Sequence, residues 1–246
     1  QFLTSFRIIG ICTNREKRGL SEAMLSRLTE IYVPPYAASD QELVINSIVQ
    51  SEINDEKSIN FYKNKLNKAN EIFSKEKEKL KMSIPFTKII EIVRTSISLH
   101  KFFTKYDRKE SEESLFGLAL LRFATENLSF DNKKKFIDIF YDENSEFSLY
   151  DGIKKLYDED SIEGTTPKDF LLLDEDQDII RSKLSNVFMP TPLNKLPETN
   201  IYFTPSLKDL ADTIISCSAI NYPLIIEGPN GSGKSSTVLY LSKCVD

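Results

Sequence analysis

Apolar residues recur at helical spacing through most of the chain. Within the Lys- and Glu-rich stretch 55–82, an apolar stripe at steps of four, three and four is formed by Tyr62, Leu66, Ala69 and Phe73. One narrow stripe predicts a long helix that packs along a single face and is solvated on the others. A basic contact surface for RNA or a protein partner on the same helix is the alternative.

Other segments share this periodicity and carry helix start or stop signals. Pro85 precedes a predicted helix over Phe86–Lys105, and the strongly apolar stretch Glu113–Leu128 predicts a core helix. The capping-box spacing of Ser39–Glu42 predicts a helix that runs through Gln50. Two or three more helices are expected between Leu128 and Phe188. The other expected helices are Leu20–Leu28, Ser206–Ile220 and Lys234–Val245. The chain is therefore expected to be α-rich overall.

Short β-branched runs interrupt the helices and predict strands. Three of them are Arg7–Cys12, Glu30–Val33 and Tyr222–Gly228. Pro34 ends the second of these runs. A fourth run, Phe170–Asp174 in FLLLDEDQD, has the apolar-then-acidic form of a Mg²⁺-binding strand. The TPKD sequence ahead of it and the helical period after it favour an acidic turn of a helix instead.

Composition and charge narrow the class of protein. A net charge of -5 and a pI of about 5.2 argue against a general nucleic-acid-binding surface, and no direct nucleic-acid site is identified. The cysteines are far apart in the sequence, which indicates a reducing compartment rather than a disulfide framework or a zinc site. No apolar run approaches the roughly 18 residues of a membrane span, so no membrane is expected. The start QFLTSFRIIGIC has neither an initiator Met nor a cationic n-region, which indicates the interior of a longer protein.

The segment EGPNGSGKSS matches the phosphate-binding pattern G-x-x-x-x-G-K-[ST] at every fixed position, between an apolar run and a predicted helix. Glycines let backbone N–H groups turn inward around phosphate oxygens, and the N-terminus of the following helix adds a positive field. Lys234 would reach the β- and γ-phosphates of ATP, and Ser235 would place its hydroxyl on Mg²⁺. The predicted nucleotide-binding residues are Gly228, Pro229, Asn230, Gly231, Ser232, Gly233, Lys234, Ser235 and Ser236. An ordinary Gly-rich turn is the alternative.

A family resemblance adds to this picture. The stretch Phe6–Tyr36, FRIIGICTNREKRGLSEAMLSRLTEIYVPPY, and the stretch Phe203–Lys243 around the phosphate-binding pattern are similar to successive AAA+ modules of the midasin family, giant dynein-like ATPases with tandem modules. The resemblance implies that Asn14, in the turn after the first strand, is a sensor-1 residue near the γ-phosphate. It also implies that Arg27 is an arginine finger for the nucleotide of the adjacent module. A turn residue and a surface-helix arginine are the plain alternatives for these two positions.

Between these stretches the family carries a helical lid. PFTKIIEIV, at 85–93, resembles its sensor-2 helix, with Lys88 where arginine is usual, and LFGLALLRFATENL, at 115–128, resembles an apolar lid helix. Lysine is a point charge, so the bidentate phosphate contact of arginine would be lost. The implied fold is a pair of α/β P-loop (AAA+) fragments joined by a mainly helical lid region. The implied domains are the end of one α/β core over 1–36, lid and insertions over 37–188, a linker over 189–202 and the start of the next module over 203–246.

The resemblance also implies a function. It makes the chain part of an ATPase that uses ATP and Mg²⁺ to remodel pre-60S ribosomal particles in the nucleus, in the nucleolus or nucleoplasm. The implied partners are neighbouring AAA+ modules of the same chain, the pre-60S particle and its assembly factors. Because the sequence holds parts of two modules, we expect it to hydrolyse ATP negligibly by itself. The alternatives are another dynein-like motor such as dynein, a non-catalytic nucleotide-binding scaffold with degenerate modules, and a small independent P-loop protein.

Overall fold

The chain divides into two compact units, residues 1–40 and 41–246. The computed structural model describes residues 19–29, 31–34, 36–53, 55–80, 86–141, 147–158, 164–174, 178–191 and 195–245. Helices predominate among these residues, so the expectation of an α-rich chain is confirmed.

The described part of the first unit holds one short helix. α2, Glu22–Leu25, begins after Ser21, whose hydroxyl accepts a hydrogen bond from a first-turn N–H at 3.3 Å. The helix predicted over Leu20–Leu28 is therefore shorter than expected. Ile31–Val33, most of the second predicted strand, pair with no strand among the described residues, and their side chains are 69–82% exposed. That prediction is wrong for these residues, because so short a run is stable as a strand only within a sheet.

The helix predicted from Ser39 is present and starts slightly earlier. α3, Ala38–Glu52, runs from the end of the first unit into the second. The Asp40 carboxylate accepts a hydrogen bond from the Ala37 N–H at 3.3 Å, which stabilises the start of the helix. Ser39 therefore lies inside the first turn instead of capping it.

α4, Glu56–Leu80, is the long helix predicted from the apolar stripe. The stripe residues are each at most 8% exposed and belong to the core: Tyr62, Leu66, Ala69 and Phe73. The Phe73 ring lies 4.8 Å from the Phe140 ring of α7, Phe130–Phe140, so the stripe packs on a neighbouring helix. The predicted packing along one face is confirmed.

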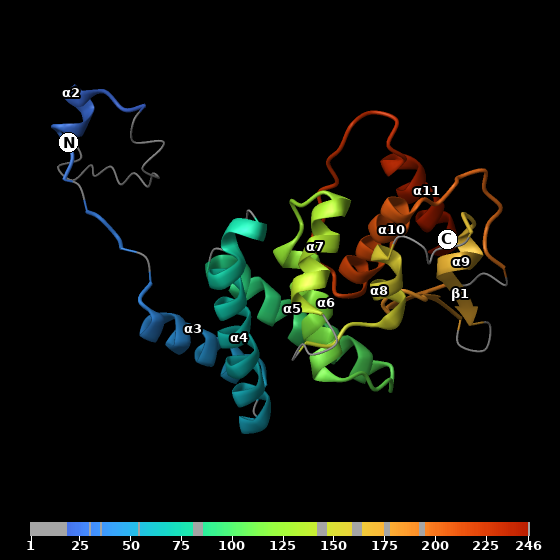
Figure 1. Cartoon of the computed structure of the whole chain (residues 1–246), viewed down its shortest axis with the longest axis horizontal. Coiled ribbons are helices and arrows are strands. Elements are labelled where there is room, and N and C mark those ends of the chain that lie inside the picture. The colour runs from blue at the N-terminus through green and yellow to red at the C-terminus, as the bar shows by residue number, and fades with distance from the viewer. Residues whose placement is uncertain are drawn as a thin grey trace, which may run out of the picture. The chain divides into compact units, whose positions relative to one another are not determined.

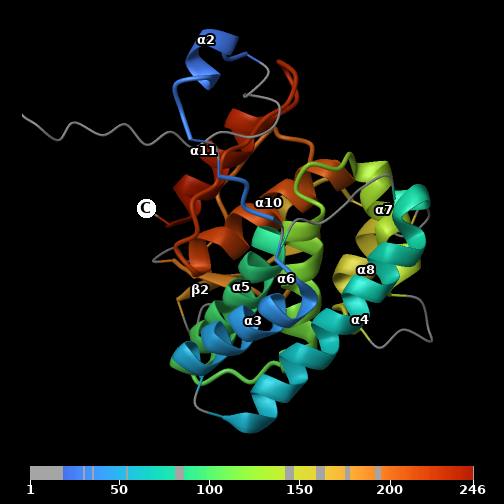
Figure 2. The same cartoon turned by 90° about the vertical axis from the view of Figure 1, so that its left-hand side faces the viewer.

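α5, Phe86–Lys105, and α6, Glu112–Ala124, form the centre of the second unit. Figure 1 and Figure 2 both show them side by side. Ser111 caps α6 by accepting a hydrogen bond from the Ser114 N–H at 3.1 Å. Every residue of α6 from Leu115 to Phe123 is buried, which confirms the predicted core helix. A helix that is buried on all sides must be enclosed by other elements.

A three-stranded antiparallel sheet occupies a region for which the sequence predicted helix. The strands are β1, Leu171–Asp174, β2, Ile179–Ser182, and β3, Phe188–Pro190, in the order β1-β2-β3. β1 pairs with β2 from Leu171 opposite Ser182 onward, and β2 pairs with β3. The predicted acidic helical turn at Asp174 is wrong, because the backbone groups of this region find their partners in the sheet ladder.

β3 also overlaps the beginning of the predicted linker 189–202. Met189 and Pro190 belong to the strand, and the Thr191 hydroxyl donates a hydrogen bond to the Cys244 carbonyl oxygen. The first residues of the predicted linker are therefore packed into the second unit.

The C-terminal part of the second unit is arranged around α10, Pro205–Ala219. Phe203, just before this helix, is fully buried and lies 4.8 Å from the Phe170 ring and 5.4 Å from the Tyr240 ring. Lys208 donates to the Gly164 carbonyl oxygen at 2.8 Å. The remaining helices of this unit are α8, Asp151–Tyr157, α9, Pro167–Phe170, and α11, Lys234–Val245.

Two findings bear on compartment and membrane. No helix among the described residues is long and apolar enough to cross a lipid bilayer. Cys217 and Cys244 are buried free thiols, and Cys12 lies outside the described residues.

Candidate nucleotide-binding loop

The candidate site lies on the connection between α10 and α11. After α10 the chain reverses at Asn221, whose φ of 54° lies in the left-handed region that asparagine tolerates. The Tyr222 N–H donates to the Cys217 carbonyl oxygen at 2.8 Å, which closes the helix end. The chain then passes Glu227 and enters the glycine-rich loop, which leads into the first turn of α11 (Figure 1).

Two glycines of the loop occupy backbone conformations that other residues reach only with strain. Gly231 has a φ of 78° and Gly233 a φ of 80°. A Cβ on Gly233 would also lie 3.0 Å from Cδ1 of Leu207 on α10, whereas a Cβ on Gly231 would meet nothing within 4 Å. Glycine is therefore required at Gly233 by both backbone and packing, and at Gly231 by the backbone alone.

The Lys234 ammonium points back over the loop. Its Nζ donates to the carbonyl oxygens of Gly228 at 2.8 Å and Pro229 at 2.7 Å, and to Ser232 Oγ at 3.2 Å. No carboxylate in the described part of the chain forms an ion pair with it. Carbonyl and hydroxyl oxygens do not neutralise the charge, so an anion over the loop would meet a full positive charge.

The first turn of α11 adds further donors. The first N–H groups of a helix have no intrahelical acceptor, and the helix dipole favours an anion beside them. Thr237 holds this end in place, because its N–H and its hydroxyl both donate to the Gly233 carbonyl oxygen at 2.9 Å. Ser235 and Ser236 are exposed on the same turn. Lys234, the first N–H groups of α11 and the hydroxyls of Ser235 and Ser236 thus lie within one helical turn of each other.

For a metal ion the loop offers fewer protein groups than it offers for an anion. The Ser235 hydroxyl, next to Lys234, could bind Mg²⁺ together with phosphate oxygens. Within the described ranges, no group of three or more His, Cys, Asp or Glu side chains is placed to hold a metal. An Mg²⁺ ion at this hydroxyl would therefore need the phosphate oxygens of a nucleotide among its other ligands.

The strand predicted ahead of the loop is not formed. Tyr222–Gly228 pair with no strand in the part of the chain that the structure describes, and Leu224 is 40% and Ile225 86% exposed. The prediction of a buried strand is wrong here, because such a run is covered only when sheet neighbours and helices enclose it. Val238 and Leu239 on α11 are exposed as well.

Lys88, the predicted sensor-2 residue, bridges α5 and the end of α6. Its ammonium is 2.7 Å from a carboxylate oxygen of Glu91 and 2.7 Å from one of Glu126. Burial alone would lower the pKa of Lys88, but these two carboxylates outweigh it and raise the pKa. The same charges act on the phenol of Tyr222, whose pKa is raised mainly by burial. Lys88 therefore lies near the chain that leads into the loop, already paired with two carboxylates.

The other predicted site residues belong to the first unit. Arg27 is exposed in the turn after α2, and among the described residues its side chain forms no hydrogen bond or ion pair. That exposure suits an arginine that acts on another module, and it equally suits an ordinary surface arginine. Asn14 and the predicted strand Arg7–Cys12 lie outside the described residues.

Asp174, the acidic residue at the end of β1, belongs to a different part of the surface. It lines a cleft of about 620 Å³ between the sheet and the α5–α6 turn. Its carboxylate lies 3.6 Å from Arg108, whose guanidinium is 4.7 Å from the centroid of the Phe188 ring. Asp174 therefore forms its ion pair with Arg108 rather than with Lys234.

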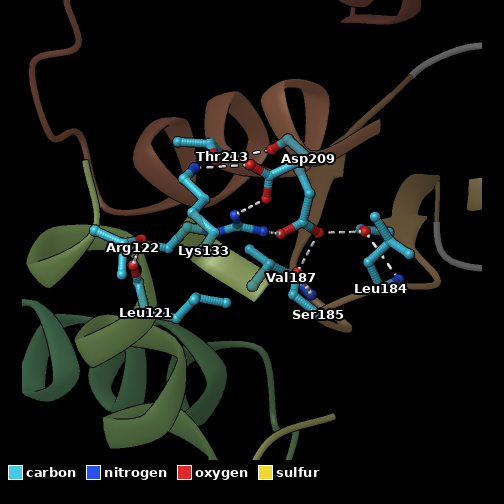
Figure 3. Close-up of polar contacts among 11 residues, drawn as sticks. Leu121, Arg122, Lys133, Leu184, Ser185, Val187, Asp209 and Thr213 are labelled. Atoms are coloured by element: carbon cyan, nitrogen blue, oxygen red, sulfur yellow. Dashed lines mark hydrogen bonds and ion pairs between the residues drawn. The ribbon is translucent and has the colours of Figure 1, made fainter. Parts of the chain in front are cut away.

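A buried ion network is the polar feature that sequence reasoning missed. The Arg122 guanidinium of α6 donates to the carboxylates of Asp209 and Asp212 on α10 (Figure 3). The side chains of Arg122, Asp209 and Asp212 are 3%, 7% and 0% exposed. Burial alone would raise the pKa of Asp209, but the charges of Arg122 and Lys133 outweigh burial and hold it well below its usual range.

This network joins four parts of the second unit. Lys133 on α7 donates to Asp209 at 2.8 Å. Asp212 accepts hydrogen bonds from Ser182, at the end of β2, and from Ser185, in the β2–β3 turn, the latter at 2.6 Å. The signal in the sequence was a pair of aspartates three residues apart, on a helix whose neighbouring positions Leu207, Leu210 and Ala211 are apolar. It did not identify Arg122 as the partner.

Comparison of the chain with protein-family models, with curated proteins and with solved structures finds no match. The ligand of the loop must therefore be inferred from the residues of this chain. In this chain a glycine-rich turn, a lysine and the N-terminus of α11 follow one another within a few residues, which is the order that phosphate-binding loops have.

Proposed function

We propose that the loop Gly228–Ser236 binds the phosphates of ATP together with Mg²⁺. The observation that carries this proposal is the Lys234 ammonium, which lies over the loop on the carbonyl oxygens of Gly228 and Pro229. A lysine in this place acts as a point charge for the β- and γ-phosphates. The N–H groups of the loop and of the first turn of α11 supply further donors. Ser235 supplies a hydroxyl for Mg²⁺, which when bound would offset part of the phosphate charge.

The sequence resemblance supports a wider assignment. In it the chain is a segment of a midasin-like AAA+ ATPase that remodels pre-60S ribosomal particles in the nucleus. The partners are neighbouring AAA+ modules, the pre-60S particle and assembly factors. Asn14 would act beside the γ-phosphate of one module, and Arg27 would stabilise charge at the nucleotide of the adjacent module.

Hydrolysis needs more than the loop. A carboxylate must bind Mg²⁺ and another group must orient the attacking water. The acidic residue that resembled such a carboxylate, Asp174, is paired with Arg108. The described residues therefore support nucleotide binding, and turnover depends on the wider assignment.

A nucleotide-binding scaffold with degenerate modules is the second candidate. The observation that favours it is Lys88, whose ammonium is occupied by Glu91 and Glu126. A cation paired in this way contributes little to a phosphate contact. Turnover by the full-length protein separates the two candidates. Loss of turnover on Lys234→Ala supports the ATPase, and unchanged turnover supports the scaffold.

The binding proposal is tested by titrating the 246-residue chain with a fluorescent ATP analogue in the presence of Mg²⁺. We expect Lys234→Ala to weaken binding by roughly tenfold or more, the effect of removing about 1.4 kcal/mol of charge interaction. Lys243→Ala, a change of an exposed lysine on the same helix, is the matched control and should bind as wild type. Equal affinity of wild type and Lys234→Ala, or no binding by wild type, would contradict the proposal.

A further inference from the structure

We infer that the buried network around Arg122 positions the phosphate-binding loop, and that it acts through α10. Arg122 would then be a positioning residue for the candidate site, although it does not contact the loop. The consequence for nucleotide affinity rests on the proposed function. The effect on the loop itself does not depend on which ligand the loop binds.

One face of α10 contacts the end of the loop, and the opposite face carries the aspartates of the buried network. Leu207 packs so closely against Gly233 that a Cβ there would lie within 3.0 Å of its side chain. Asp209 follows two residues later, and at about 100° per residue it lies on nearly the opposite side of the helix. Asp212, three residues further, shares the face of Asp209. A displacement of α10 toward or away from α6 therefore moves the surface on which Gly233 rests.

The network gives α10 one defined position. The planar guanidinium of Arg122 donates to two carboxylates at once, so its geometry is more restrictive than that of a single ion pair. All three side chains are buried, and no water can replace a lost hydrogen bond without a rearrangement. Lys133 and the hydroxyl of Ser185 restrain the same carboxylates from α7 and the β2–β3 turn. Rotation or translation of α10 would break several charged hydrogen bonds together.

The loop depends on this support because its other side is exposed. Leu224 and Ile225, which lead into it, are exposed and pair with no strand among the described residues. The contact between Leu207 and Gly233 joins the end of the loop to α10, and the Thr237 bonds to the Gly233 carbonyl oxygen join it to the first turn of α11. Weakening the network should therefore loosen the loop and the first turns of α11 before the helical core opens.

A purely structural network would lower global stability and leave the loop no looser than the rest of the unit. The test is amide hydrogen exchange of residues 228–241, measured in the 246-residue chain at conditions where each variant is fully folded. Arg122→Lys keeps the charge and loses the two-pronged contact. Lys133→Met removes the outer partner of Asp209 and keeps Arg122, so it decides the question if Arg122→Lys does not fold.

The matched control is Lys65→Met. Lys65 is 15% exposed and pairs with Glu113 at 2.5 Å, whereas Lys133 is 14% exposed and pairs with Asp209 at 2.8 Å. Both lysines are half-buried on helices that border the core, and Lys65 pairs with α6 rather than with α10. A general loss of stability would affect the loop equally in the two methionine variants.

We expect exchange over 228–241 to rise by roughly tenfold in Arg122→Lys, the change that corresponds to about 1.4 kcal/mol, and by a smaller factor in Lys133→Met. Lys65→Met should match wild type in this segment. The affinity for the fluorescent ATP analogue should fall in the same order. Wild-type exchange over 228–241 in both network variants, or an equal rise in Lys65→Met, would overturn the inference.

The two proposals fail separately. If wild type binds no ATP analogue while exchange responds as expected, the proposed function is wrong and the positioning of the loop stands. If wild type binds the analogue while exchange and affinity ignore the network, the positioning role is wrong and the binding site stands.

Discussion

Arg122 and Lys234 belong to the same unit, and their surroundings differ in every respect that matters for binding. Arg122 is buried and donates to Asp209 and Asp212, whereas Lys234 faces carbonyl and hydroxyl oxygens in an open loop. A buried cation must be neutralised by its own chain, because isolated burial of a charge is very costly. A cation that contacts only neutral oxygens keeps its charge for a ligand. The network therefore satisfies its own charges inside the fold, and the loop is the candidate for direct contact with a ligand.

The largest expected effect comes from removing the buried cation. Arg122→Met leaves Asp209 and Asp212 buried with Lys133 as the remaining cation. We expect the free energy of unfolding to fall by about 3–5 kcal/mol, the usual result of removing one partner of a buried ion pair. Lys234→Ala should change it by less than about 0.5 kcal/mol, as surface substitutions do. Urea unfolding followed by circular dichroism measures the unfolding free energy of each variant. Similar losses of unfolding free energy in Arg122→Met and Lys234→Ala would remove the contrast between the two regions.

Acid should weaken the network through Asp209. The pKa of Asp209 is held well below its usual range, so its carboxylate stabilises the fold above the pKa of an unfolded aspartate, about 3.9. This stability is lost as the pH falls below that value. Asp209→Asn should cost about 2–3 kcal/mol at pH 7, the value of charged hydrogen bonds. Its unfolding free energy should also depend less on pH between about 5 and 3 than that of wild type. If the unfolding free energies of wild type and Asp209→Asn changed in parallel with pH, Asp209 would not be the group that causes the loss of stability in acid.

Alanine at Gly231 and at Gly233 compares the backbone of the loop with its packing. Gly231→Ala should cost about 1 kcal/mol from its left-handed conformation alone. Gly233→Ala should cost about 1–2 kcal/mol more, because the new Cβ would also press against Leu207. Thermal unfolding of the two variants measures the difference. Equal midpoints would mean that Leu207 does not support Gly233 as closely as the structure indicates.

The smallest expected effect on stability belongs to Ser235→Ala. The hydroxyl is exposed, so the unfolding free energy should change by less than about 0.5 kcal/mol. The increase in ATP affinity that Mg²⁺ produces should fall by roughly tenfold, the range seen when a group in a metal site is lost. Ser236→Ala, the neighbouring exposed serine, should keep the full response to Mg²⁺. An unchanged Mg²⁺ response in Ser235→Ala would show that this hydroxyl does not bind the ion.

The long helices and the loop could be predicted because their signals are local. The stripe of α4 and the apolar run of α6 lie within single helices, and both are buried as expected. The glycines of the loop are a local signal because glycine permits the positive φ angles that a tight loop needs. The structure places Gly231 and Gly233 at positive φ. Lys234 and Ser235 were assigned from the same short pattern, and their roles stay predictions.

Two stretches of secondary structure were decided by tertiary structure rather than by local pattern. The stretch 177–184 has a helical period, yet its residues Ile179–Ser182 form β2, since their backbone pairs with β1 on one side and β3 on the other. Tyr222–Gly228 had the composition of a buried strand and stays unpaired among the described residues, since a strand requires neighbours.

Arg122 and its aspartates show most clearly where local reasoning ends. Each of these residues has an opposite charge nearby in the sequence, Glu126 for Arg122 and Lys208 for the aspartates, but in the structure Glu126 pairs with Lys88 and Lys208 donates to the Gly164 carbonyl oxygen. The sequence by itself determined the long helices and the glycine-rich loop, because those depend on groups a few residues apart. The tertiary structure decided which charges meet in the core, because desolvation and ion pairing act between segments that only folding brings together.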